Sequence, residues 1–155
     1  MIDLSGLDPK LHKAVTALAF DMRAHGYQRG DPVREVFALL GDRWTTLILL
    51  VLNIGVWRHA ELRRVLSRLA AEGKISQRVL TLKLRALERD GIVRRQATAD
   101  VPPTVSYELS DLGRSLIGET RRLMAWVHGH RAEIDTARAA FEASSGARAP
   151  RPRPG

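Results

Sequence analysis

The chain has 155 residues, 45% of them hydrophobic, which is the usual size and composition of one compact domain with small appendages. It contains no cysteine, and this excludes a disulfide framework, a thiol redox switch, a cysteine-ligated zinc site and a cysteine nucleophile. The formal net charge of +8 favours nucleic acid or another anionic surface as a partner.

The first thirty residues predict a helical arm. Asp8 and Pro9 form a helix start, an N-cap acceptor before proline at the first helical position, and Gly26 can end the helix. Between these two points the apolar residues with helical spacing are Leu11, Val15, Leu18 and Met22.

A second Asp-Pro pair, Asp31 and Pro32, begins a short helix that ends near Gly41. Asp42 then caps a third helix, from residue 43 to about 53, whose lack of a polar face predicts burial at the centre. The apolar run around it, residues 47–57, is too short to cross a bilayer, and the first residues lack the pattern of a signal peptide. We therefore expect a soluble protein of the cytoplasm with no membrane partner.

Two further helices follow, joined by a turn that contains glycine. The first spans residues 59–72 and stops at Gly73, and the second starts after a Ser76 cap and ends at Asp90, before Gly91. Leucines at helical spacing predict the inward faces: Leu62, Leu66 and Leu69 in the first helix, and Leu80, Leu84 and Leu87 in the second.

After residue 91 the apolar period changes from that of a helix to that of a strand. Residues 92–98 and 104–109 predict a β-hairpin whose tip, 99–103, contains two prolines. Ser110 caps a last long helix, which Gly118 and Gly129 weaken, so that a break near Gly129 is expected as one alternative. A coiled-coil-like apolar seam runs along it: Leu116, Thr120, Leu123, Val127, His130, Ile134, Ala137 and Phe141. From residue 143 onward Ser, Gly, Arg and Pro predict disorder.

Basic charge is concentrated in residues 58–95, which hold eleven basic and four acidic side chains. Residues 1–57 hold six of each, residues 96–142 hold five basic and seven acidic, and the tail adds three arginines. At about 100° per residue, the helix after Ser76 has its core-facing leucines at 80, 84 and 87 on one side. The opposite side carries Arg78, Leu82, Arg85 and Arg89, and Thr81 lies at the edge between the two sides. Such a face suits guanine edges, phosphates and thymine methyl groups, although a solvated helix face is also commonly charged.

The order helix, turn, helix and hairpin is that of a winged helix-turn-helix, whose second helix enters the major groove of DNA. The helix before the turn carries arginines at 63, 64 and 68, and the hairpin carries them at 94 and 95. Basic side chains on three consecutive elements favour nucleic acid over a merely solvated face.

Several stretches of sequence carry a family resemblance. They are Asp-Pro-Val at 31–33, Gly-Asp-Arg-Trp at 41–44, Ile-Ser at 75–76, Val-Leu-Thr at 79–81, Leu-Glu-Arg-Asp-Gly-Ile-Val at 87–93 and Leu-Ser-Asp-Leu-Gly at 109–113. From residue 31 to about 126 the chain resembles the HxlR family of bacterial winged-helix transcription regulators, which are similar to MarR proteins. The resemblance implies a mainly α-helical fold with a small β-hairpin wing at 92–109 and a recognition helix that starts at Ser76.

The resemblance also implies a homodimer, formed through the N-terminal and C-terminal helices, that binds an inverted repeat near a promoter. Two features depart from the family pattern. Asp31 stands where the family usually has a cysteine, and a helix-capping role is expected for it instead. The segment from Glu61 to Ile75 is about six residues longer than the family pattern, on the order of 9 Å if helical.

These inferences divide the chain into a dimerising helical arm at 1–30, a winged helix-turn-helix domain at 31–128, a C-terminal helix extension at 129–142 and a disordered Arg/Pro tail at 143–155. The residues expected to bind DNA are Arg58, Arg63, Arg64, Ser76, Gln77, Arg78, Thr81, Arg85, Arg94 and Arg95. Among them Arg78, Thr81 and Arg85, with Gln77, are expected at base edges, and the arginines of the other elements at phosphates. The residues expected at the dimer interface are Leu11, Val15, Leu18, Met22, Leu116, Leu123, Val127, Ile134 and Phe141.

Other interpretations have less support. The histidines at 128 and 130 have the wrong spacing for two ligands on one helix face, so no metal or other cofactor is expected, and no enzyme motif occurs. Trp44, Trp57, Tyr107 and Trp126 line either an effector pocket or the core, and the core is favoured. The sequence leaves open whether an unidentified small molecule binds as an effector. The alternative function is a winged-helix protein–protein interaction module that does not bind DNA.

Overall fold

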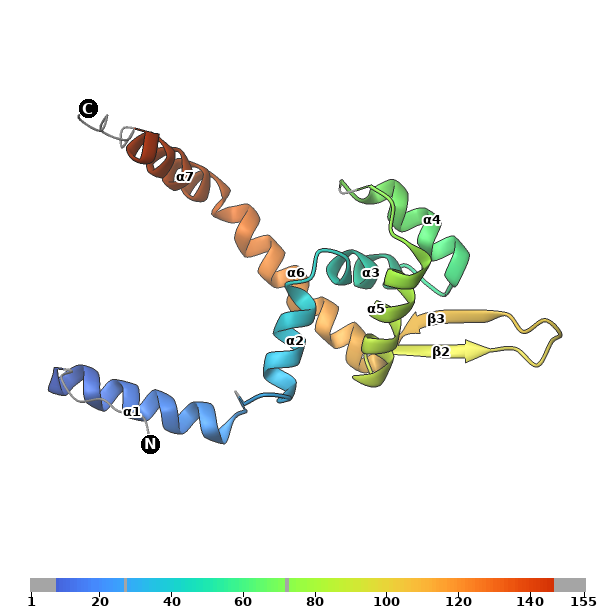
Figure 1. Ribbon diagram of the computed structural model, residues 1–155, viewed down its shortest axis with the longest axis horizontal. Helices are drawn as coiled ribbons and strands as arrows, with labels where there is room; N and C mark the ends of the chain where they lie inside the picture. The colour runs from blue at the N-terminus through green and yellow to red at the C-terminus, as the bar shows by residue number, and fades with distance from the viewer. Residues whose placement is uncertain (1–7, 27, 72, 147–155) are drawn as a thin grey trace, which may run out of the picture.

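The computed structural model describes residues 8–26, 28–71 and 73–146, and in this part of the chain it contains seven helices and one three-stranded sheet (Figure 1). The elements are α1 (Pro9–Ala24), α2 (Pro32–Leu40), α3 (Thr45–Leu52), β1 (Trp57–Arg58), α4 (His59–Leu69), α5 (Gln77–Arg89), β2 (Val93–Ala97), β3 (Val105–Leu109), α6 (Asp111–Gly129) and α7 (Arg131–Gly146). The predicted fold class, mainly α-helical with a β-hairpin wing, is confirmed.

Helix α3 lies at the centre of the core, as its uniformly apolar sequence predicts. Its side chains Ile48 and Leu49 are completely buried, and α3 contacts α2, α4, α6 and β3. The leucine stripes of the neighbouring helices complete the core: Leu62 and Leu66 from α4, and Leu80, Leu84 and Leu87 from α5. This packing fixes α4 and α5 against one rigid centre.

Side chains at the helix starts satisfy the first backbone amides, in most cases as predicted. The Asp42 carboxylate accepts hydrogen bonds from the amides of Trp44 and Thr45, at 3.0 and 3.1 Å. Ser76 accepts from the Val79 amide at 3.2 Å. The expectation for Asp31 is wrong: it precedes α2, but its carboxylate makes no capping bond and instead accepts from the Gln28 amide in the joint before the helix.

The sheet has the order β1-β3-β2, and both pairs are antiparallel. Strands β2 and β3 form the predicted hairpin, which extends away from the helices (Figure 1). Strand β1 is absent from the sequence-based expectation because two residues are too short to show a period. It pairs Trp57 with Tyr107, and the Trp57 indole nitrogen donates to the Val51 carbonyl at 3.0 Å.

The end of α4 differs from the prediction. The helix ends at Leu69, not at residue 72, because Ala70 adopts an extended conformation. Leu69 was expected to face inward but is 60% exposed. Residues 70, 71 and 73–76, between α4 and α5, are therefore not helical, and Glu72 lies outside the described residues. The additional residues before Ile75 were expected to extend α4, and they do not.

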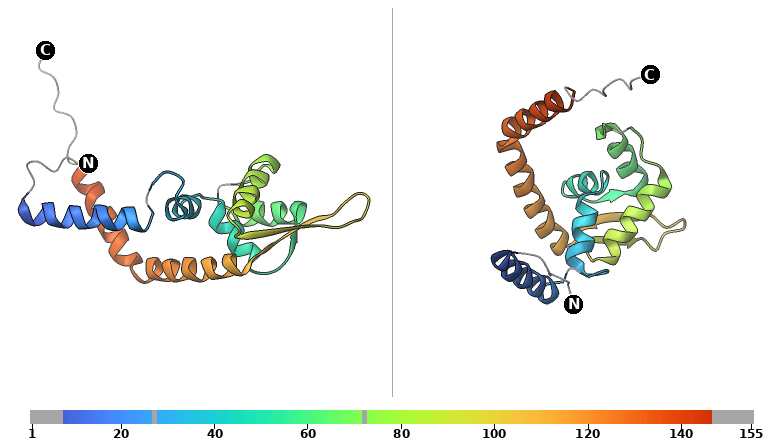
Figure 2. Two further views of the ribbon diagram at one scale, coloured as in Figure 1. Left: turned by 90° about the horizontal axis from the view of Figure 1, so that it is seen from below. Right: turned by 60° about the vertical axis from the view of Figure 1, so that its left-hand side comes forward.

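Two helical arms project from this body. Helix α1 buries none of its residues, and α6 leads into α7 across a bend at His130, so the break expected near Gly129 is confirmed (Figures 1 and 2). Helix α7 reaches Gly146, one turn past the predicted boundary at 142, so residues 143–146 of the predicted disordered tail are helical. Residues 147–155 of that tail lie outside the described residues.

The aromatic residues divide between the core and the surface. Trp44 and Tyr107 are buried, as the core interpretation predicts, and Trp57 is half-buried. Trp126 is 57% exposed and stacks on His130 with ring centroids 4.4 Å apart, so the core interpretation is wrong for this residue. Among the described residues, no helix combines the length and the hydropathy needed to cross a bilayer.

Candidate nucleic-acid interface

Helix α5 presents two chemically different faces. Leu80, Leu84 and Leu87 point into the core, whereas Arg78 and Arg85 are exposed. Leu82, on the exposed face, keeps 55% of its surface accessible. The outward orientation that helical spacing predicts for these side chains is therefore what the fold produces, and the face combines two guanidinium groups with one large apolar side chain.

A hydrogen bond across to α4 orients one edge of α5. The Thr81 hydroxyl donates to the Gln77 carbonyl at 2.9 Å and also lies 3.1 Å from Nε2 of His59, the first residue of α4. Thr81 is consequently half-buried and its hydroxyl already has two partners. A contact from Thr81 to a base would use its methyl group, because the hydroxyl is engaged within the protein.

His59 is a part of this site that the sequence analysis does not single out. Burial, and then the positive charge of Arg63, lower the pKa of His59 below the ordinary imidazole value of 6.5. Its ring also lies 6.2 Å from the ring of Tyr107 in β3. His59 therefore joins α4, α5 and the sheet at one point. A lone histidine at a helix start gives no sequence signal for this role.

An ion pair attaches the middle of α5 to the start of α3. The Lys83 ammonium group donates to the second carboxylate oxygen of Asp42 at 2.7 Å. Burial raises the pKa of Asp42, but the hydrogen bonds from Lys83, Trp44 and Thr45 outweigh it and hold this pKa below its ordinary value. Lys83 thus fixes the position of α5 and does not belong to the exposed basic face.

The end of α5 is paired in a similar way. Arg89 donates from Nε and Nη2 to the two carboxylate oxygens of Asp90, at 2.8 and 3.2 Å. A carboxylate oxygen of Glu35, on α2, lies 3.7 Å from Nη2 of Arg89. Although helical spacing turns Arg89 outward, its charge is offset by these two acids.

Basic side chains from α4 and from the connection line a groove beside the start of α5. The groove has a volume of about 340 Å³ and contains Arg63, Arg64 and Lys74. Ser76 and Gln77 follow directly, at the N-terminal end of α5, which favours negative charge. Lys74 is absent from the predicted site, although its charge contributes to the basic excess of residues 58–95.

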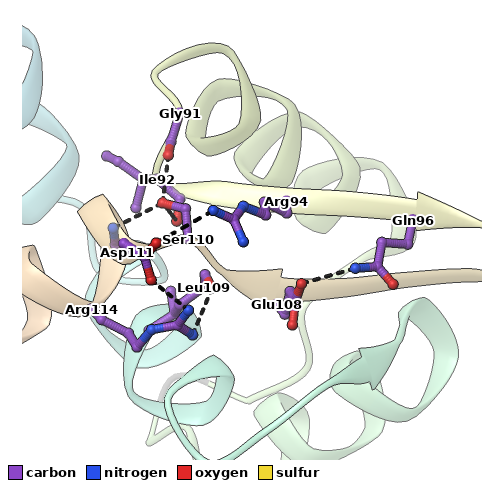
Figure 3. Close-up of polar contacts among 10 residues, drawn as sticks. Gly91, Ile92, Arg94, Gln96, Glu108, Leu109, Ser110, Asp111 and Arg114 are labelled. Carbon is purple, nitrogen blue, oxygen red and sulfur yellow. Dashed lines mark hydrogen bonds and ion pairs between the residues drawn. The ribbon is translucent and has the colours of Figure 1, made fainter.

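The two adjacent arginines of the hairpin point to opposite faces, since side chains alternate along a strand. Arg95 lies opposite Tyr107 and is exposed, and none of the ion pairs found in the described residues includes it. Arg94 lies opposite Glu108, and its Nη2 is 3.6 Å from the Asp111 carboxylate (Figure 3). The hydrogen bond and charge of Arg114, and the charge of Arg94, lower the pKa of Asp111. Arg94 is therefore partly neutralised, and Arg95 is the free cation of this strand.

The elements that carry these side chains gather at one end of the molecule. Helix α4, helix α5 and the hairpin lie together at the end opposite the α1 and α7 arms (Figure 1). Residues 39–135, which include all of these elements, match the family described as HxlR-like helix-turn-helix. The chain belongs to the HxlR-like family.

The relatives of this HxlR-like chain are transcriptional regulators. The HTH-type transcriptional regulator YdeP of Bacillus subtilis is 36% identical over 114 residues, which is 74% of this chain and 84% of the relative. Among solved structures, the regulator YtfH from Salmonella typhimurium matches with a TM-score of 0.58 and 31% identity, over 74% of this chain and 96% of that one. The redox regulator HypR in its reduced form matches with a TM-score of 0.56 and 33% identity, over 68% and 99% of the two chains.

Family and relatives together make this HxlR-like chain a DNA-binding transcriptional regulator and not an enzyme. Its surface separates the ten predicted DNA-binding residues into two groups. The Thr81 hydroxyl has partners in α4 and α5, and Arg94, although exposed, lies beside Asp111 of α6. The other eight are exposed: Arg58, Arg63, Arg64, Ser76, Gln77, Arg78, Arg85 and Arg95. In the described residues, no three His, Cys, Asp or Glu side chains come together as a metal site.

Proposed function

We propose that this HxlR-like protein is a homodimer that reads an inverted-repeat operator in double-stranded DNA. Helix α5 lies in the major groove with Arg78 and Arg85 at base edges and Leu82 near thymine methyl groups. Arg58, Arg63 and Arg64 hold phosphates beside it, and Arg95 reaches the backbone from the wing. The observation that carries this proposal is the exposure of Arg78, Leu82 and Arg85 on a helix whose opposite face is completely buried. Among the described residues, no ion pair includes either of these arginines.

The dimer is supported by apolar side chains that one chain leaves uncovered. Among the nine predicted interface residues, Leu11, Leu18, Leu123, Val127 and Phe141 are exposed, and the other four are half-buried. They lie on α1, α6 and α7, the helices that project from the body (Figure 2). Exposed apolar stripes of this kind are commonly covered by a second copy. A two-fold pairing would present two α5 helices to the two halves of an inverted repeat.

The remaining assignments follow from this arrangement. Residues 1–30 form the dimerising arm, 31–128 the DNA-binding domain, 129–142 the C-terminal extension and 143–155 an Arg/Pro tail that α7 enters for its first residues. The site of action is the cytoplasm, because bacterial DNA lies there. A small molecule is proposed as the effector. A cysteine cannot act as the sensor, since the chain contains none.

The test compares two arginines on a selected operator and on random duplexes, with the operator obtained by selecting genomic fragments that the protein binds. Arg78→Ala should reduce the preference for the operator by about 1–3 kcal/mol, and Arg95→Ala should weaken all duplexes alike. Arg122→Ala, which removes a side chain paired with Glu119 on α6, serves as the control. Fluorescence anisotropy gives the affinity of each variant for the operator and for random duplexes. Its salt dependence, measured at several salt concentrations, reports the number of phosphates contacted.

Equal losses on operator and random DNA for both variants would contradict the division between base-reading and phosphate-holding arginines. Failure to bind any duplex at low salt would refute DNA recognition by this surface and favour the alternative, a winged-helix module that binds another protein.

A further inference from the structure

A cavity lies on the side of the molecule where α2 meets the end of α5 and the start of α6. Its volume is about 510 Å³, and small-molecule sites usually have roughly 300–1,000 Å³. Apolar side chains form most of its wall: Pro32, Val36, Ile92, Leu112 and Leu116. Leu112 keeps 58% of its surface exposed, so an apolar molecule placed here would cover surface that the chain itself leaves open.

The charged groups at the edge of this cavity are Glu35, Arg89 and Asp90. Asp90 occupies the guanidinium of Arg89 with two hydrogen bonds, at 2.8 and 3.2 Å. The Glu35 carboxylate is 3.7 Å from Arg89, beyond hydrogen-bond distance. Of the two ion pairs that Arg89 makes in the described residues, the one with Glu35 is the longer. The edge therefore has one more carboxylate than guanidinium, and Glu35 is the less closely held of the two carboxylates.

We propose that this cavity binds a small apolar molecule that carries one positively charged nitrogen. The ammonium group pairs with Glu35, and the apolar body covers Leu112 and packs against Val36. An anionic ligand would have to displace Asp90 from Arg89 and would meet the charge of Glu35, and a neutral ligand would gain the apolar contacts alone. The charge at the edge selects for a cation.

The position of the cavity connects the ligand to DNA binding, and this step rests on the proposed function. Arg89 is the last residue of α5, and Glu35 lies on α2, which follows the α1 arm. A cation paired with Glu35 weakens the attraction of Glu35 for Arg89 and so loosens the end of the recognition helix from α2. Ligand binding should consequently change the affinity for the operator.

The binding site is tested by isothermal titration calorimetry on the full chain without DNA, using phenylbutylamine, phenylbutanol and phenylbutyrate. These probes share an apolar body and differ in charge. We expect saturable binding at one site per chain, with the amine about fivefold tighter than the alcohol and the carboxylate weakest. Glu35→Gln should bring the amine to the affinity of the alcohol, and Leu112→Ser should weaken the amine and the alcohol alike.

Glu133→Gln, a change of the same kind on α7, is the matched control and should leave all three affinities unchanged. Glu35 and Leu112 are both accessible, so their variants should keep the fold, which circular dichroism verifies. The proposal is overturned if the amine binds no more tightly than the carboxylate, or if Glu35→Gln behaves like Glu133→Gln.

Anisotropy with an operator duplex, with and without phenylbutylamine, tests the connection to DNA separately. The amine should shift the duplex affinity of the wild-type chain and not that of Glu35→Gln. An unchanged duplex affinity together with calorimetric binding would overturn the regulatory step. A chain that binds the amine but no duplex would instead refute the proposed function, so the two failures are distinguishable.

Discussion

At the scale of single residues, Gly113 fixes the junction between the wing and α6. A Cβ atom at this position would overlap the carbonyl oxygen of Ile92, which Ser110 already holds through its amide and its hydroxyl. The Ser110 hydroxyl oxygen also accepts from the Gly113 amide at 3.0 Å. Glycine is required here because the first turn of α6 lies directly against the start of β2.

Gly113→Ala should lower the free energy of unfolding by about 1–3 kcal/mol, since either the backbone or the cap must move. Urea denaturation measures the change. Gly118→Ala is the matched control on the same helix: nothing lies within 4 Å of an added Cβ there. Alanine at that exposed position should raise stability by up to about 1 kcal/mol. Equal effects of the two variants would show that close packing at residue 113 is not the cause.

His59 gives the protein a stability that depends on pH. Because its pKa lies below 6.5 in the folded chain, the unfolded chain takes up a proton first as the pH falls, and stability is lost on acidification. Between about pH 7.5 and 5.5, the wild-type chain should lose more free energy of unfolding than His59→Gln, which does not titrate and keeps a donor for Thr81. The facing groups Arg63 and Tyr107 stay unchanged in this comparison. Parallel pH profiles of the two proteins would contradict the prediction.

The residues of the site show where sequence reasoning succeeds. The exposed positions of Arg78 and Arg85 follow from helical spacing, because the leucines of α5 determine which face is buried. Thr81 and Arg94 have partners in other elements, His59 in α4 and Asp111 in α6. Spacing within one element contains no information about such contacts, and only the assembled fold brings the partners together.

At the scale of elements, the ion pair between Lys83 and Asp42 holds α5 against the start of α3. Lys83→Met should cost about 1 kcal/mol of stability, because the pair is only partly exposed to water. Asp42→Asn keeps an oxygen for the α3 cap and removes the charge. If the ion pair is the interaction that matters, the double variant should cost less than the sum of the two single variants, as urea denaturation would measure. Additive costs would refute a direct coupling between the two side chains.

The boundaries of the elements were predictable where a cap or a clear period marks them. Asp8, Ser76 and Ser110 each accept from an amide of the helix that follows them. Asp42 also accepts from the Thr45 amide, but α3 begins at Thr45 and not at residue 43 as expected. The end of α4 was not predictable, because the first residue after Leu69 that signals a helix end is Gly73. The chain leaves the helix three residues earlier, at Ala70. A two-residue strand such as β1 exists only through its pairing with β3, and local sequence does not encode that pairing.

At the scale of the whole molecule, the proposed dimer depends on the α1 and α6–α7 arms. Val127, on α6, is 43% exposed in one chain and belongs to the proposed dimer interface. Val127→Glu should convert the protein to monomers in sedimentation experiments, because a carboxylate buried between two copies would lose its hydration. Val101→Glu, at the tip of the wing and 97% exposed, should remain dimeric. An unaltered dimer in Val127→Glu would place the interface elsewhere.

Helix α1, which buries none of its residues in the described part of one chain, has a consequence for gene dosage. If two chains must meet before the arm is covered and two reading helices face the DNA, then below the dimer dissociation constant the active species varies with the square of the chain concentration. Halving expression would then leave about one quarter of the operator-binding form. The number of gene copies and the rate of synthesis would themselves become signals that this regulator transmits.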